Sequence, residues 1–165
     1  MNPRSVLHNR LRTVGLDGQN EVWAALRGVD DPEYPGVSIV DLGLVEDVRV
    51  EGGRVDVDLV PTFSGCPALA MIAADVRAAI GVLDTVDDIE VRFVHSPVWT
   101  PERIAPSARE AIAEHFTVAV TTIGRPTPCP RCGAAALVEE SMFGPVRCRS
   151  IHRCRSCGER IEVIR

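Results

Sequence analysis

The 165-residue sequence has no lysine, few aromatic residues and no long hydrophobic run. Its longest apolar stretch, residues 68–74, is far too short for a transmembrane helix, which needs about 20 residues. The first 30 residues contain no apolar segment of signal-peptide length. We therefore expect a cytoplasmic protein without a membrane partner, in which cysteines stay reduced or bind metal and do not form disulfides.

The charge is unevenly distributed along the chain. Residues 1–124 carry 10 Arg against 19 Asp and Glu, whereas residues 125–165 carry 8 Arg against 4 Glu. A basic segment can indicate nucleic acid binding. Four thiolates around a divalent ion would offset part of this positive charge, however, and only Phe143 could stack on a base. A solvated arginine-rich surface is the favoured interpretation, and nucleic acid is not the expected partner.

Alternating apolar and polar residues predict three strands, at 48–50, 55–59 and 89–93. The first two form a hairpin around a Glu-Gly-Gly turn, and a helix from Pro67 to about Ile80 leads from the second strand to the third. We expect an α/β fold, a small two-layer mixed sheet with helices on one face, in residues 1–120.

Two further helices are expected outside this crossover. One opens at Asp17 and ends at Gly28. The other is opened by a capping box of Ser107 and Glu110 and ends near His115.

The order of the elements brings three loops to one edge of the sheet. If the second and third strands run parallel, their carboxyl ends share an edge, and the first strand begins there. Ligands usually bind at this edge in open α/β folds. The converging residues are Asp41 before the first strand, Thr62 and Cys66 after the second, and His95 after the third.

Cys66 stands alone between Gly65 and Pro67, far from the other five cysteines. Because Pro67 suits the first helical position, Cys66 is predicted to be the helix N-cap. The first turn has no acid, so free helix N–H groups would lower the pKa of the thiol and favour the reactive, metal-binding thiolate. The alternative is a small buried residue that only fills space, and Asp31 and Asp41 can equally be turn formers.

The remaining cysteines include two pairs with metal-site spacing, 21 residues apart and each followed by a glycine. This pattern predicts a small ribbon at 129–165, after a linker at 121–128, that holds one metal through four thiolates. Zinc is favoured, with a rubredoxin-like iron as the rival. Cys148 and His152 compete with the second pair, but neither forms an x-x pair with another cysteine. The predicted ligands are Cys129, Cys132, Cys154 and Cys157.

Short motifs cover nearly the whole chain, from about Val22 to Glu162. They are DPE at 31–33, DLGLV at 41–45, PTFSGCP at 61–67, PVWT at 97–100, AR at 108–109, CPRCG at 129–133, SMFG at 141–144, Cys148, and RCRSC at 153–157. Together they resemble the phenylacetate-degradation PaaD family, which joins a SufT-like iron–sulfur assembly domain to a zinc ribbon. We expect many relatives to carry one more cysteine near the C-terminus, where this sequence reads EVIR.

The resemblance implies an accessory role in the multicomponent oxygenase that epoxidises phenylacetyl-CoA. It implies that the protein helps to install iron–sulfur clusters in a client such as the reductase component, with Cys66 as a transient ligand of a cluster or of iron. It also places Asp31 and Glu33 at this site. Since clusters usually take four protein ligands, a homodimer, a client cysteine or a small thiol must supply the others.

Two other functions compete with this one. The first is a zinc-ribbon adaptor that binds nucleic acid or protein without cluster chemistry. The second is a thiol enzyme that uses Cys66 with His95, although no motif pairs these residues. The sequence carries neither a di-iron helix pattern nor a flavin or nicotinamide fingerprint, so we expect no independent catalysis.

Overall fold

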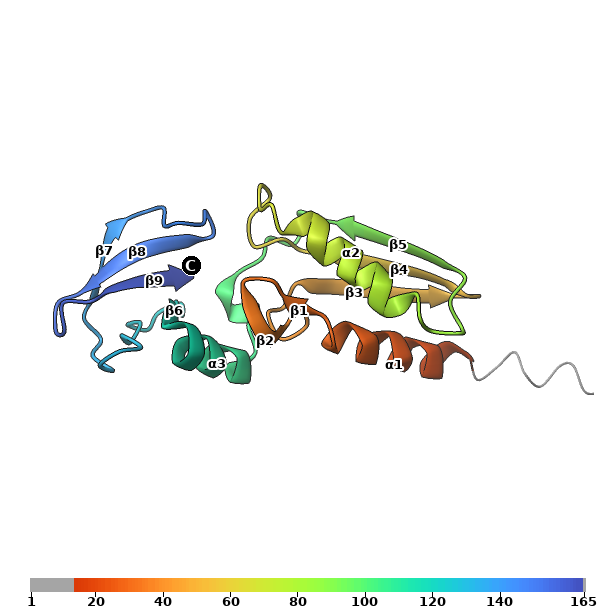
Figure 1. Cartoon of the computed structure of the whole chain (residues 1–165), viewed down its shortest axis with the longest axis horizontal. Coiled ribbons are helices and arrows are strands. Elements are labelled where there is room, and N and C mark those ends of the chain that lie inside the picture. The colour runs from red at the N-terminus through yellow and green to blue at the C-terminus, as the bar shows by residue number, and fades with distance from the viewer. Residues whose placement is uncertain (1–13, 165) are drawn as a thin grey trace, which may run out of the picture.

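The computed structural model describes residues 14–164, which form an elongated molecule with a three-stranded sheet at one end and a four-stranded sheet at the other (Figure 1). The elements in chain order are α1 (Val14–Arg27), β1 (Asp30–Asp31), β2 (Tyr34–Ser38), β3 (Val45–Glu51), β4 (Arg54–Leu59), α2 (Leu69–Ile80), β5 (Asp88–Phe93), a 3-10 turn (Pro101–Arg103), α3 (Pro106–Phe116), β6 (Val118–Val120), β7 (Leu137–Ser141), β8 (Arg149–Cys154) and β9 (Arg160–Ile164).

The three-stranded sheet has the order β3-β4-β5. The central strand β4 pairs antiparallel with β3 and parallel with β5, so Val57 lies opposite both Val48 and Val91. Helices α1 and α2 pack against this sheet and against each other (Figure 1). The predicted hairpin, the crossover helix and the shared carboxyl edge of β4 and β5 are thus confirmed.

The core forms between this sheet and its helices because both present one apolar face. In β4, Val55, Val57 and Leu59 are fully buried, while the alternating aspartates point outward. In α2, Ile72, Val76 and Ile80 share one helical face and are also buried. Each such side chain stabilises the fold by about 1.5–3 kcal/mol.

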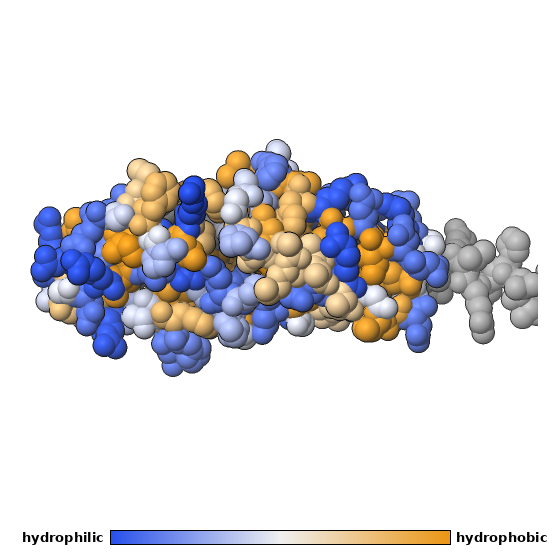
Figure 2. Space-filling view, turned by 45° about the horizontal axis from the view of Figure 1, so that its top comes forward, coloured by the Kyte–Doolittle hydropathy of each residue, from blue (hydrophilic) through white to orange (hydrophobic). Residues whose placement is uncertain are grey.

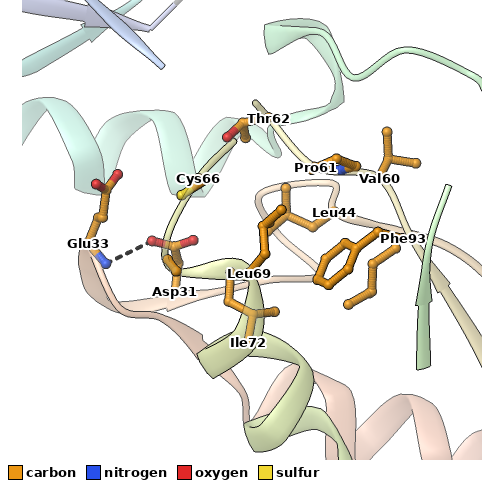
Figure 3. Close-up of a pocket in the computed structure, with 12 residues that line it drawn as sticks. Asp31, Glu33, Leu44, Val60, Pro61, Thr62, Cys66, Leu69, Ile72 and Phe93 are labelled. Atoms are coloured by element: carbon orange, nitrogen blue, oxygen red, sulfur yellow. Dashed lines mark hydrogen bonds between the residues drawn. The ribbon is translucent and has the colours of Figure 1, made fainter. Parts of the chain in front are cut away.

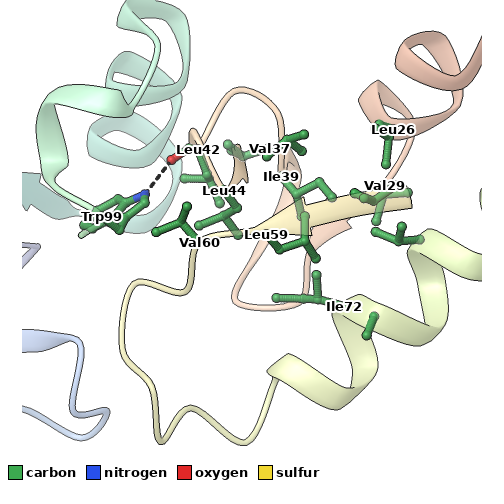
Figure 4. Close-up of a cluster of buried hydrophobic side chains, with 14 of the residues drawn as sticks. Leu26, Val29, Val37, Ile39, Leu42, Leu44, Leu59, Val60, Ile72 and Trp99 are labelled. Atoms are coloured by element: carbon green, nitrogen blue, oxygen red, sulfur yellow. Dashed lines mark hydrogen bonds between the residues drawn. The ribbon is translucent and has the colours of Figure 1, made fainter. Parts of the chain in front are cut away.

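The core continues past the carboxyl edge of the sheet toward Trp99 (Figure 4). The buried indole N–H of Trp99 donates to the Leu42 carbonyl oxygen at 3.0 Å. Gly43 makes this turn possible, since its φ is +69° and a Cβ there would lie 2.5 Å from the Cβ of Arg103. The Leu42–Gly43 turn is therefore fixed against the segment that follows β5.

The four-stranded sheet has the order β6-β9-β8-β7. β6 pairs parallel with β9. Val118–Val120 was expected to belong to the first domain, before the linker, so the ribbon sheet includes a strand from outside the expected ribbon. Val118 and Ile164 belong to the same buried cluster as β3 and β4. The two sheets are consequently joined by a continuous apolar core.

Three predicted helix starts are wrong. α1 begins at Val14, three residues before Asp17. α2 begins at Leu69 with Ala68 as its N-cap, because the chain first closes a turn in which the Leu69 amide donates to the Cys66 carbonyl oxygen. Cys66 therefore precedes the helix and does not cap it. α3 begins at Pro106 without a side-chain cap, so Ser107 lies inside its first turn; proline is well suited to this N1 position.

The outer surface is mixed in character. On the face shown in Figure 2, hydrophobic patches are divided by hydrophilic residues along the whole molecule. Exposed apolar side chains such as Val82, Val98 and Ile123 come from separate loops. None of the helices within residues 14–164 is long and apolar enough to cross a membrane.

Candidate functional site

Cys66 lies in the loop from Pro61 to Ala68, which connects the carboxyl end of β4 to α2. The loop folds back on itself because the Cys66 amide donates to the Phe63 carbonyl oxygen at 3.1 Å. A Cβ at Gly65 would lie 2.9 Å from the Phe63 ring, so any other residue there would have to push this ring aside. The result is a half-buried thiol at the predicted edge of the sheet.

Two carboxylates approach Cys66 from the β1–β2 hairpin. Asp31 and Glu33 line a cavity of about 20 Å³ together with Cys66 and Thr62, and apolar side chains such as Leu44 close its other side (Figure 3). The Glu33 amide donates to Asp31 Oδ1 at 2.8 Å. Burial raises the pKa of Asp31, and the hydrogen bond from this amide opposes that shift.

Cys148 comes to the same place from the other sheet. Its thiol donates to Glu33 Oε2 across 3.7 Å. Burial, reinforced by the Glu33 charge, raises the pKa of Cys148 to about 11. From the sequence, Cys148 competes as a ligand of the ribbon metal. The one sign in the sequence against this role is that Cys148 forms no C-x-x-C pair with another cysteine.

Arg149, the next residue, contacts side chains from both parts of the molecule. Its guanidinium donates to Glu33 Oε2 at 3.1 Å and to Glu162 Oε2 at 2.7 Å. It also lies 4.7 Å from the centre of the Tyr34 ring, a cation–π arrangement. An ion pair thus connects the β1–β2 hairpin to strands β8 and β9.

The other predicted site residues lie around this centre or apart from it. Thr62 lines the small cavity beside Cys66 and also a second cavity that contains His95, which is exposed. Asp41 is exposed, and its carboxylate accepts a hydrogen bond from the Ser38 hydroxyl at 2.9 Å. Asp41 does not line the small cavity beside Cys66.

The four ribbon cysteines form a second, separate centre. Their sulfur atoms all lie within 4.8 Å of one another. The Cys129–Cys157 and Cys132–Cys154 sulfur pairs are 3.8 and 3.7 Å apart. A tetrahedral ion with metal–sulfur bonds of about 2.3 Å needs sulfur atoms about 3.8 Å apart, so this donor set fits such an ion.

Two glycines shape the loops that carry these cysteines. The amides of Gly133 and Gly158 each donate at 2.8 Å to the carbonyl oxygen four residues earlier, that of Cys129 and of Cys154. Both glycines have positive φ, 73° and 82°. Backbone N–H groups of Cys157 and Ser156 lower the pKa of Cys154 to about 7, which favours the metal-binding thiolate.

Comparison with known families matches two parts of the chain. Residues 19–93 match a family described as iron–sulfur cluster assembly protein. Residues 114–165 match the PaaD zinc beta ribbon domain. The second match includes β6, in agreement with its place in the ribbon sheet.

Individual relatives cover the chain to different extents. A protein of Escherichia coli K12, provisionally named as a component of 1,2-phenylacetyl-CoA epoxidase, is 33% identical over 91% of this chain and 94% of its own. The Fe-S protein maturation auxiliary factor YitW of Bacillus subtilis is 38% identical over 57% of this chain and 92% of its own.

A solved structure resembles part of the chain. The crystal structure of a DUF59 domain of unknown function from Bacillus anthracis has a TM-score of 0.56 and 36% identity, and the match covers 59% of this chain and 93% of that one.

Proposed function

Because this chain belongs to the family that joins an iron–sulfur cluster assembly domain to a PaaD zinc ribbon, we propose that it carries an iron–sulfur cluster, or iron, to a client protein. The proposed client is the reductase component of a phenylacetyl-CoA epoxidase, and Cys66 is the proposed transient ligand. The name of the Escherichia coli relative supports an epoxidase as the system that is served, and the maturation factor YitW supports the carrier role. We place this activity in the cytoplasm, where free thiols such as these six cysteines stay reduced.

The position of Cys66 is the observation that carries this proposal. The thiol lies half-buried at the edge of the sheet, outside the ribbon cluster and beside the Asp31 and Glu33 carboxylates. Thiolates are the usual ligands of iron–sulfur clusters. A site with so few ligands holds its cargo only until client cysteines displace them, as transfer requires.

The ribbon has a different role in this proposal. Four thiolates complete the coordination of one zinc ion and leave no open position for a substrate, as in structural zinc sites. Bound zinc would supply folding free energy to a segment with a small core of its own. The expected activity is therefore carriage and not catalysis.

The test is the Cys66→Ser variant, purified without oxygen. Serine is nearly isosteric with cysteine, so we expect an unchanged melting temperature and full ribbon zinc. Iron and sulfide bound after reconstitution should fall, and so should the cluster content of the reductase in cells. Ser64→Ala, a change at an exposed position in the same loop, is the matched control and should behave as wild type.

Equal client cluster content in the Cys66→Ser variant and the wild type would sink the carrier role of this residue. The zinc-ribbon adaptor without cluster chemistry would then be the better description.

A further inference from the structure

Cys148 and Cys66 face one cavity from opposite parts of the molecule. The cavity has a volume of about 190 Å³, and Glu33 also lines it. We propose that Cys148 and Cys66 form a two-thiolate ligand pair for the iron–sulfur cargo, one thiolate from the ribbon and one from the assembly domain. This inference rests on the carrier role proposed above and adds a second protein ligand to it.

The backbone before β8 holds Cys148 in place. The Gly144 amide donates to the Arg149 carbonyl oxygen at 2.7 Å, and the Arg149 amide donates to the Val146 carbonyl oxygen at 3.2 Å. These two bonds close the loop that ends at Cys148. The thiol consequently sits at the start of a paired strand, which is a more rigid support than a free loop.

Contacts of neighbouring residues bring this loop to Cys66. The Arg149 guanidinium, whose side chain is only 12% exposed, binds Glu33 and packs over the Tyr34 ring. Both partners belong to the β1–β2 hairpin, whose Glu33 also lines the small cavity beside Cys66. The approach of the two cysteines is therefore set by a partly buried ion pair between the two parts of the molecule.

The chemistry of the cavity suits an anionic cargo bound through sulfur. On binding, Cys66 and Cys148 would each form a bond to iron and release the thiol proton to solvent, with no change of oxidation state. Arg147 lines the cavity beside Cys148 and would offset part of the negative charge of a thiolate-bound cluster. Two protein thiolates leave half of the usual four ligand positions to the client or to small thiols.

The hairpin that contacts Arg149 also contains a buried hydroxyl without a partner. The Tyr34 side chain is 5% exposed, and its hydroxyl has no hydrogen-bond partner among the described residues. The Tyr34 ring lies 4.7 Å from the guanidinium of Arg149, the residue that follows Cys148. A buried donor without an acceptor costs about 1–3 kcal/mol, so the contact between the two parts of the molecule includes one unfavourable group.

The experiment uses the full-length, zinc-loaded protein, reconstituted without oxygen with ferrous iron and sulfide. Cluster retention is then measured by visible absorption during challenge with an iron chelator. Loss of an outer-shell partner of a metal ligand lowers metal affinity by roughly ten-fold or more. Loss of a ligand itself should cost at least as much affinity, so Cys148→Ser should release its cluster about ten-fold faster than wild type or more. Phe143→Ser, at an exposed position in the same hairpin, is the matched control.

Alkylation of the wild type gives a second readout that needs no variant. Because the raised pKa of Cys148 slows its alkylation, iodoacetamide is applied at alkaline pH and for a long exposure. Mass spectrometry should then find both Cys66 and Cys148 shielded in the cluster-loaded protein and modified in the cluster-free protein. Shielding of Cys66 alone, or cluster loss confined to Cys66→Ser, overturns the pair and leaves the carrier role standing. A wild type that takes up no cluster overturns both.

Discussion

Thr117 is the only non-glycine residue with positive φ in the chain from 14 to 164, at φ 56° directly after α3. A β-branched residue in this left-handed region costs about 1–2 kcal/mol, whereas glycine adopts it freely. Thr117→Gly should therefore raise the free energy of unfolding by about 0.5–1 kcal/mol, as measured by urea denaturation. Thr100→Gly is the control: Thr100 has an extended φ of −137°, so this change should lower stability. A fall in stability with Thr117→Gly would show that the threonine side chain is needed there.

Single residues were predicted unevenly from the sequence. Cys66 is correctly placed at the edge of the sheet, because alternation in the strands fixes which loops meet there. The approach of Cys148 and the ion pair of Arg149 with Glu33 were not predicted. Both depend on how the two sheets pack, and no local pattern in one sequence encodes contacts between residues more than a hundred positions apart.

At the scale of elements, the four-cysteine cluster is the feature that a single substitution should disrupt most. Cys129→Ser should release the ribbon zinc and unfold β7–β9, because the buried cluster of this part is small. Circular dichroism should keep the α2 helix signal, and metal analysis should find zinc lost. Cys66→Ser is the comparison variant and should keep its zinc. Equal zinc loss in both variants would contradict this ligand assignment.

The outer face of the three-stranded sheet carries an arginine–aspartate network that should make the stability of the protein depend on pH. Although partial burial acts the other way, hydrogen bonds from Arg92 and Arg49 lower the pKa of Asp58. A carboxyl group with a depressed folded-state pKa stabilises the protein above its unfolded pKa of about 3.9, and this contribution is lost as the pH falls through the folded value.

In the Asp58→Asn variant, the free energy of unfolding should therefore fall less steeply as the pH is lowered from about 4 to about 2. The stability lost at pH 7 should be at most about 1 kcal/mol, since the arginines are well exposed. Acid titrations followed by circular dichroism check this. An unchanged acid transition in the variant would show that these ion pairs do not contribute.

Elements with a clear period were predicted well, and short ones were not. The apolar spacing of α2 and the alternation in β4 confirm the expected helix and strand types. β6 has only three residues, too few for a period, and its strand character depends on pairing with β9. The start of α2 was misplaced because Pro67 is equally suited to the turn that precedes the helix.

At the scale of the whole molecule, Arg149 connects the two sheets. Replacing it with glutamine removes ion pairs to Glu33 and Glu162 and the contact with Tyr34. Glu33 and Glu162 are partly exposed, so water would hydrate their unpaired charges in part, and Arg149→Gln should lower the free energy of unfolding by about 1–2 kcal/mol. Arg147→Gln, at an exposed neighbouring position, should stay within about 0.5 kcal/mol of wild type. Urea denaturation of the two variants decides between this role and a surface ion pair without effect.

The parallel pairing of β6 with β9 also orders events during synthesis on the ribosome. Val118 pairs with Glu162, and β6 has no other neighbour in its sheet. The nascent chain must therefore emerge as far as β9 before β6 can be paired. Arg149 likewise gains its Glu162 partner only at that stage. A half-made chain thus exposes Cys66 without the fully supported Cys148 loop, so the complete cavity becomes available only to a protein whose translation has passed β9.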